Sequence, residues 1–299
     1  MDNTIRVFSG RTFSSEDIEL IKWARKTYPK LPKYEFAGTV CELLGWTTQS
    51  GRSKEQQCLA FLEKLEAEGI IKLPHTNNIR KNKSSVRVSE IIFDTKEIEG
   101  EVSEYEPIRL TIARPGKDLS RWRSYINQYH MLGFKTVFGS RLQYFIKSGD
   151  IELGCIQFSA SSWALAERDK WIGWTADNRK TYLHIVVNNS RFLIFPWVHI
   201  RNLASKALSL AAKQIQEDWL REYCYAPVLL ETFVDLEHFK GTCYKAANWL
   251  YLGETKGRGR MDRNNEHALS KKAIFVYPLQ NDFKACLRGE KPYKVVEPE

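Results

Sequence analysis

The chain has 299 residues, of which 43% are hydrophobic and 12% aromatic. These values argue against a disordered chain and indicate one large domain or two modest ones. Lysine and arginine number 45 against 36 aspartate and glutamate residues, which gives a net charge of +9. This excess favours a polyanionic partner such as nucleic acid, or an anionic cofactor.

The sequence shows no targeting or membrane segment. Its start, MDNTIRVFSGRTFSSED, has no apolar core, and no apolar run approaches the roughly 20 residues of a membrane-spanning helix. The six cysteines are scattered without a CxxC pair, which indicates neither a disulfide framework nor a zinc site. We therefore expect a cytoplasmic protein with reduced thiols and no membrane contact.

Apolar residues recur at helical spacing in three segments between residues 14 and 74. The segments are SSEDIELIKWARKTY, KYEFAGTVCELLGW and SKEQQCLAFLEKLEAEGIIKLP, and the last of them stops at Gly69 and continues into the strand-like IIKLP. Three helices and a wing are typical of a winged-helix or helix-turn-helix module, which we assign to residues 1–74. A plain three-helix packing unit is the alternative.

Residues 75–106 change character, from the basic HTNNIRKNKSS to an acid-rich stretch with little periodicity. We expect a linker here, with a short strand at 86–93. From Pro107 onward, β-rich runs alternate with helical runs in the order strand, helix, hairpin, strand, long helix, strand, helix. This order predicts an α/β domain with a mixed sheet over residues 107–299.

The junction FLIFPWVHIRNLASKAL passes from a strand into the longest predicted helix, which begins near Ala204. The first backbone N–H groups of a helix lack helical partners, and the helix dipole favours negative charge there. Ala204 and Ser205 are small enough to let a phosphate approach, and Arg201 would add a cation. An ordinary capped helix start is the alternative.

The next strand, LLETFVD, ends in Asp235, and the helix after it carries Tyr244 and Asn248. Tyr244 and Asn248 are four residues apart and would share one helix face. A phenol beside a cleft can give its proton to a leaving group, and a carboxylate at a strand end can orient it. These three residues are the candidate catalytic set. In the alternative, Asp235 caps a turn and Tyr244 is a core aromatic.

A glycine-rich basic segment follows that helix. Glycines let the backbone follow a phosphate chain, and arginine binds phosphate oxygens or stacks on bases. A solvated basic turn is the alternative, and no pattern of ligands predicts a metal site. The candidate nucleic-acid-binding residues are Lys256, Arg258, Arg260 and Arg263.

The cluster RDKWIGW, residues 168–174, places two tryptophans around Gly173. It would form either a wall for base stacking or a corner of the core. We expect the core corner.

Long motifs in this sequence resemble the DruA family, named for a component of the Druantia anti-phage defence system. The motifs are LGCIQFSASSWALAERDKWIGW, VVNNSRFLIFPWVHIRNLASKAL, LLETFVD and GTCYKAANWLYLGETKGRGR. The segment from YEFAGTVCELLGW to CLAFLEKLEAEGIIKLP is also similar to the start of that family, so the resemblance covers nearly the whole chain. It implies a defence protein that acts on or binds single- or double-stranded DNA, with other defence proteins as partners.

The order from IRNLASKAL through TFVD to YKAANW is similar to the second half of the GNAT acyltransferase fold. It is similar in particular to the phage Mom-type branch, which modifies DNA. This resemblance implies that Asp235 and Tyr244 are site residues and that acyl-CoA is the cofactor. The loop for its pyrophosphate would be Arg201, Asn202, Leu203, Ala204 and Ser205, although the usual acyltransferase loop has glycines where Leu203 and Ala204 stand.

The GNAT resemblance also implies a specific sheet geometry. Two parallel strands, 191–197 and 227–234, should diverge around the start of a helix over 203–223. Three functions follow from these patterns: a GNAT-like nucleic-acid-modifying acyltransferase, a non-catalytic DNA-binding subunit of a defence or transposon-associated system, and a nuclease- or transposase-related enzyme.

Overall fold

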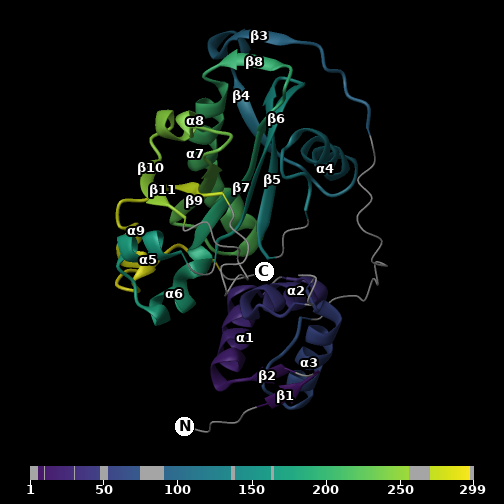
Figure 1. Cartoon of the computed structure of the whole chain (residues 1–299), viewed down its shortest axis with the longest axis vertical. Helices are drawn as coiled ribbons and strands as arrows, with labels where there is room; N and C mark the ends of the chain where they lie inside the picture. The colour runs from purple at the N-terminus through teal and green to yellow at the C-terminus, as the bar shows by residue number, and fades with distance from the viewer. Residues whose placement is uncertain are drawn as a thin grey trace. The chain divides into compact units, whose positions relative to one another are not determined.

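The computed structural model describes residues 6–9, 11–29, 31–47, 53–74, 91–135, 139–162, 165–255 and 270–296 (Figure 1). The chain divides into two compact units, Met1–Lys81 with Val137–Ser140 and Asn82–Thr136 with Arg141–Glu299. Each unit has its own hydrophobic core. The six cysteines are free thiols. Within the described ranges, no helix combines the length and apolar character needed to cross a bilayer.

The N-terminal unit consists of a hairpin followed by three helices. Its elements are β1 (Arg6–Phe8), β2 (Arg11–Phe13), α1 (Ser15–Thr27), α2 (Lys33–Leu44) and α3 (Glu55–Ala67). The three predicted helices are thus confirmed. A capping box starts α1: the Ser14 hydroxyl accepts from the backbone N–H of Asp17, whose carboxylate accepts from the N–H of Ser14. Phe13 of the hairpin stacks on Phe61 of α3 with ring centroids 4.0 Å apart.

The expected wing after α3 is wrong, because residues 70–74 form no strand. Ile71 and Leu73 are buried while Lys72 between them is exposed, so the sequence alternates as a strand does. The backbone here binds side chains instead of a neighbouring strand. The N–H of Leu73 donates to Glu66 Oε1, and the Lys72 carbonyl accepts from Arg25 Nε.

The C-terminal unit contains the predicted mixed sheet, in the strand order β10-β11-β9-β7-β6-β5-β4. Its strands are β4 (Ile108–Ile112), β5 (Arg141–Ser148), β6 (Ile151–Ala160), β7 (Val186–Ile194), β9 (Leu229–Asp235), β10 (Leu250–Glu254) and β11 (Lys272–Pro278). The helices are α4 (Lys117–Tyr129), α5 (Ala166–Ile172), α6 (Ala176–Tyr182), α7 (Leu203–Tyr223), α8 (Thr242–Ala246) and α9 (Phe283–Leu287). Short 3-10 turns lie at Val102–Tyr105 and Leu183–Ile185.

Helices α4 and α7 cover opposite faces of this sheet. Neighbouring residues of a strand point to opposite faces. On β5, the Tyr144 hydroxyl donates to Asp218 of α7, while the ring of Phe145 meets Tyr125 of α4 edge to face. The sheet is therefore enclosed between the two helices, which explains why its central strands are rich in buried apolar residues.

The described part of the expected linker, residues 91–106, packs on the C-terminal unit. Phe93 stacks on Tyr125 with ring centroids 3.7 Å apart. Strand β3 (Ile98–Glu101) pairs in parallel with β8 (Val198–Arg201) as a separate two-stranded sheet. The short strand expected at 86–93 is not formed at 91–93, and 86–90 lie outside the described residues.

Strands β7 and β9 form the predicted pair of parallel strands, and they separate part-way along their length. Pairing runs from Val186 with Leu229 to Asn189 with Thr232 and then stops. Beyond this point β7 pairs only with β6 and β9 only with β11. A bulge at Ser190, where Asn189 and Arg191 pair with successive residues of β6, accompanies the separation. Helix α7 has the predicted bounds, whereas β7 begins five residues before the predicted 191.

Candidate functional site

Tyr244 lies at the point where β7 and β9 separate. Its hydroxyl donates to Asn189 Oδ1 at 2.7 Å, and Thr232 Oγ1 lies 3.4 Å away. Asn189 and Thr232 are the last residues that pair the two strands. The ring stacks on Phe275 and meets Trp249 edge to face, and burial raises the pKa of the phenol. Tyr244 thus holds the two strands together from within the core.

Asn248 does not share a helix face with Tyr244. Helix α8 ends at Ala246, and Asn248 has a left-handed backbone with φ of 61°. The side chain of Asn248 is exposed, whereas only 7% of Tyr244 is exposed. Spacing of four residues predicts a shared face only if the helix continues, and this helix is five residues long. The structure therefore separates this pair of candidates.

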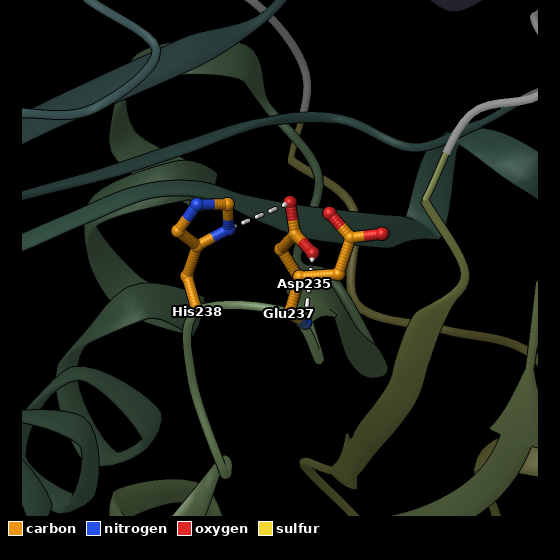
Figure 2. A group of neighbouring side chains, drawn as sticks. All are labelled: Asp235, Glu237 and His238. Carbon is orange, nitrogen blue, oxygen red and sulfur yellow. Dashed lines mark hydrogen bonds and ion pairs between the residues drawn. The ribbon is translucent and has the colours of Figure 1, made fainter.

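Asp235 ends β9 at the edge of the sheet (Figure 2). Its Oδ1 accepts from the backbone N–H of Glu237, and its Oδ2 accepts from Ser270 Oγ at 3.1 Å and lies 3.5 Å from His238 Nδ1. Desolvation works to raise its pKa, but these hydrogen bonds and the charges of His238 and Lys272 hold the pKa below its usual value. Asp235 is therefore an ionised carboxylate at neutral pH.

Glu237 and His238 complete a group around Asp235 that the sequence patterns did not single out. Figure 2 shows the three side chains together, with one ligand atom of each within 4.8 Å of the others. Two carboxylates and an imidazole are ligand types for a divalent transition metal, and an Asp–His pair can also accept a proton. The signal in the sequence is the run DLEH directly after a buried strand, because the turn brings its polar side chains back to the strand end.

The residues that follow the basic segment lie beside Asp235. Strands β10 and β11 form a hairpin, in which the N–H of Thr255 donates to the carbonyl of Lys272. Lys272 pairs with Asp235 in the sheet, and Ser270 donates to the Asp235 carboxylate. The predicted nucleic-acid-binding residues themselves lie outside the described residues: Lys256, Arg258, Arg260 and Arg263. Of the described residues that flank them, Ser270 lies at the end of β9.

The predicted pyrophosphate loop lies where β8 passes into α7. Asn202 adopts a left-handed backbone with φ of 64°, and its carbonyl accepts from the Ser205 hydroxyl and the N–H of Lys206. Leu203, the first residue of the helix, is buried, and Ala204 follows it half-buried. The five predicted residues thus lie together where α7 begins.

The cations at this helix start already have carboxylate partners. Arg201 Nη1 lies 3.3 Å from Glu101 Oε1, and Lys206 forms an ion pair with Glu106. The hydrogen bond from Lys206 lowers the pKa of Glu106 and keeps it charged. Both ion pairs are exposed, and pairs of this kind are weak, so a pyrophosphate that binds at this helix start would displace the two carboxylates.

A family profile described as Druantia protein DruA matches residues 64–268, which is more than half of the chain. The chain belongs to the DruA family. No curated protein shows significant sequence similarity to it. The matched region of this DruA-family chain contains Asp235, His238 and Tyr244, as well as the basic residues after β10.

Solved structures similar to this DruA-family chain are acetyltransferases. A spermidine N-acetyltransferase chimera from Vibrio cholerae and hSSAT has a TM-score of 0.38 and 10% identity, and covers 57% of this chain and 95% of its own. An aminoglycoside acetyltransferase in complex with coenzyme A has a TM-score of 0.38 and 12% identity over 57% and 94%. An N-acetyltransferase from Staphylococcus aureus Mu50 has a TM-score of 0.35 and 10% identity over 58% and 99%. Similarity at this level carries no conclusion about activity.

The DruA motif RDKWIGW forms a corner of the core, as predicted. Arg168 and Glu231 are both 0% exposed, and Arg168 Nη1 donates to Glu231 Oε2 at 2.8 Å. Arg168 also donates to Asp169 and to the carbonyl of Ser162, whose N–H donates to Glu231 Oε1. Every charge in this network is paired, as burial in a low dielectric requires. Glu231 precedes Thr232 on β9, so the network lies on the face opposite Tyr244.

Proposed function

We propose that this DruA-family protein is a defence protein that binds DNA through residues 256–272 and acts on it at the end of β9. One observation carries the proposal. The Asp235 carboxylate meets Ser270, at the root of the basic segment, and His238, a half-exposed base, at the same time. A nucleic acid held by the segment would therefore lie next to a proton acceptor.

The binding step follows from charge. Residues 256–272 contain six lysines and arginines against two acidic residues. Cations that neutralise phosphates release counterions, so such binding has little sequence preference and weakens steeply with salt. The glycines between Lys256, Arg258 and Arg260 let the backbone follow the phosphates.

The chemical step follows from the Asp235–His238 pair. Asp235 faces Nδ1 of His238 and so favours the tautomer with its proton on that nitrogen, which leaves Nε2 as the acceptor. Nε2 would take the proton of an attacking nucleophile while the Asp235 carboxylate stabilises the imidazolium. The supported reaction class is therefore base-assisted group transfer or hydrolysis. This step uses only Asp235 and His238 and needs no acyl-CoA.

The second candidate is a non-catalytic DNA-binding subunit. The observation that favours it is the burial of Tyr244, whose hydroxyl is used to hold Asn189. In that function the basic segment would still bind DNA, whereas His238 would be dispensable. Either function places the protein in the cytoplasm with its nucleic-acid target.

Two measurements on the full chain test the proposal. In gel-shift titrations with duplex DNA, Arg258→Ala with Arg260→Ala should weaken binding and flatten its salt dependence, whereas His238→Gln should bind as the parent does. Mass spectrometry of phage and host DNA should then show modified or cleaved products with the parent protein and none with His238→Gln. DNA binding without any change in the DNA would favour the non-catalytic subunit, and unchanged binding by the double variant would rule out the basic segment as the DNA contact.

A further inference from the structure

The N-terminal unit carries a shallow basic groove of about 370 Å³ between the end of α1 and the segment after α3. Four of the seven residues that line it are cations, and none is acidic. The lining residues are Lys22, Arg25, Lys26, Pro29, Ile70, Ile71 and Lys72. Such a surface attracts an anionic partner.

Arg25 fixes the two walls of the groove relative to each other. Its Nε donates to the Lys72 carbonyl at 2.7 Å, and its Nη1 donates to the Pro29 carbonyl at 3.0 Å. Burial lowers the pKa of Arg25, although the charge of Glu66 opposes the shift. Because its donors are used on carbonyl groups, Arg25 is a tie between α1 and residues 70–72.

The three lysines are the groups that can meet a ligand. Lys22 and Lys26 are one helical turn apart, about 6 Å along the axis of α1, and face the groove together. Lys72 supplies the opposite wall, and all three are exposed. The ion pair of Lys22 with Glu19 is also exposed, and a pair of this kind is weak enough to exchange its partner. Cations near a helix end also offset its dipole, but Lys72 belongs to no helix.

We propose that this groove is a second contact to the phosphate backbone of DNA. Each DNA strand presents one phosphate per about 3.4 Å of its axis, so lysines about 6 Å apart reach separate phosphates. The inference rests on the proposed DNA binding, and it moves the DNA contact of the N-terminal unit from the expected wing to α1 and residues 70–72. An acidic peptide in the same groove is the competing occupant.

The test is the salt dependence of binding to a random-sequence duplex, measured with the full chain. The variant Lys22→Ala, Lys26→Ala, Lys72→Ala is compared with Lys33→Ala, Lys54→Ala, Lys64→Ala, which removes the same charge elsewhere in the unit. The groove variant should lower the slope of log affinity against log salt by about 2 to 3, near 0.9 for each lost phosphate contact, and the control by much less. Lys72→Ala alone should lower it by about 1.

Equal slopes of log affinity against log salt for the groove and control variants would overturn the inference. An acidic peptide would then be the candidate ligand of the groove. This failure is distinct from failure of the proposed function. If Arg258→Ala with Arg260→Ala changes the slope and the groove variant does not, the segment is the contact and the groove is not. If only the groove variant changes the slope, the groove contacts DNA and residues 256–272 do not.

Discussion

The middle and the end of strand β9 use polar residues in opposite ways. In the middle, Glu231 and Thr232 are buried, and their partners are fixed by other elements of the fold. At the end, Asp235 is partly exposed. It accepts from the backbone N–H of Glu237 in the following turn and from Ser270, which precedes β11. A buried polar group with all its partners stabilises the fold, whereas a partly exposed one remains able to react. Burial therefore distinguishes two carboxylates of one strand, the structural Glu231 and the partly exposed Asp235.

The largest expected effect is at Glu231. The change Glu231→Ala leaves the buried Arg168 guanidinium with Asp169 as its remaining carboxylate partner and leaves the N–H of Ser162 without its acceptor, which costs up to about 3–5 kcal/mol of unfolding free energy. Urea denaturation measures this loss. Glu237→Ala, at the end of the same strand, is the matched control and should stay within about 0.5 kcal/mol. Similar losses for the two variants would remove the contrast between the two parts of β9.

Tyr244 distinguishes a core role from a catalytic one. Tyr244→Ala should cost about 3–5 kcal/mol, because a buried ring is removed. Tyr244→Phe keeps the ring but leaves Asn189 Oδ1 without its donor, which costs about 1–3 kcal/mol. Thermal denaturation compares the two variants. Loss of phage protection by Tyr244→Phe at an unchanged melting temperature would instead identify the phenol as catalytic.

The smallest expected stability effect is at Asp235, and it depends on pH. A carboxylate whose pKa is lowered by folding stabilises the protein above its unfolded pKa, which is about 3.9 for aspartate. This contribution is lost as the pH falls through the lowered native value. Asp235→Asn should therefore be slightly less stable than the parent at pH 7, and the difference should begin to shrink below about pH 4. A difference that grows in acid would show that Asp235 is not ionised in the folded protein.

The sequence predicted those parts of the fold that depend on local pattern. The helical spacing of apolar residues in α7 predicted its bounds. The order of elements predicted that β7 and β9 are parallel. Residues 70–74 form no strand because the backbone of Lys72 and Leu73 is hydrogen-bonded to side chains of α1 and α3, which no local pattern predicts. The carboxylate of Glu101 reaches Arg201 through the pairing of β3 with β8, which no local pattern encodes.

The sequence predicted Asp235 at the end of β9 but not its partner His238. Asp235 was found because it ends a buried run, and strand ends gather at one edge of a sheet. Asn248 was misplaced because the helix stops two residues before it. His238 was overlooked because no spacing rule pairs a histidine with the carboxylate three residues earlier in a turn.

The central claim is that the end of β9, and not Tyr244, carries the function. Plating of phage on cells that carry the Druantia system with His238→Gln or with Tyr244→Phe in this chain tests it most directly. The account predicts that His238→Gln loses protection at an unchanged melting temperature, while Tyr244→Phe keeps protection at a lowered one. Full protection by His238→Gln together with loss of protection by Tyr244→Phe would contradict it.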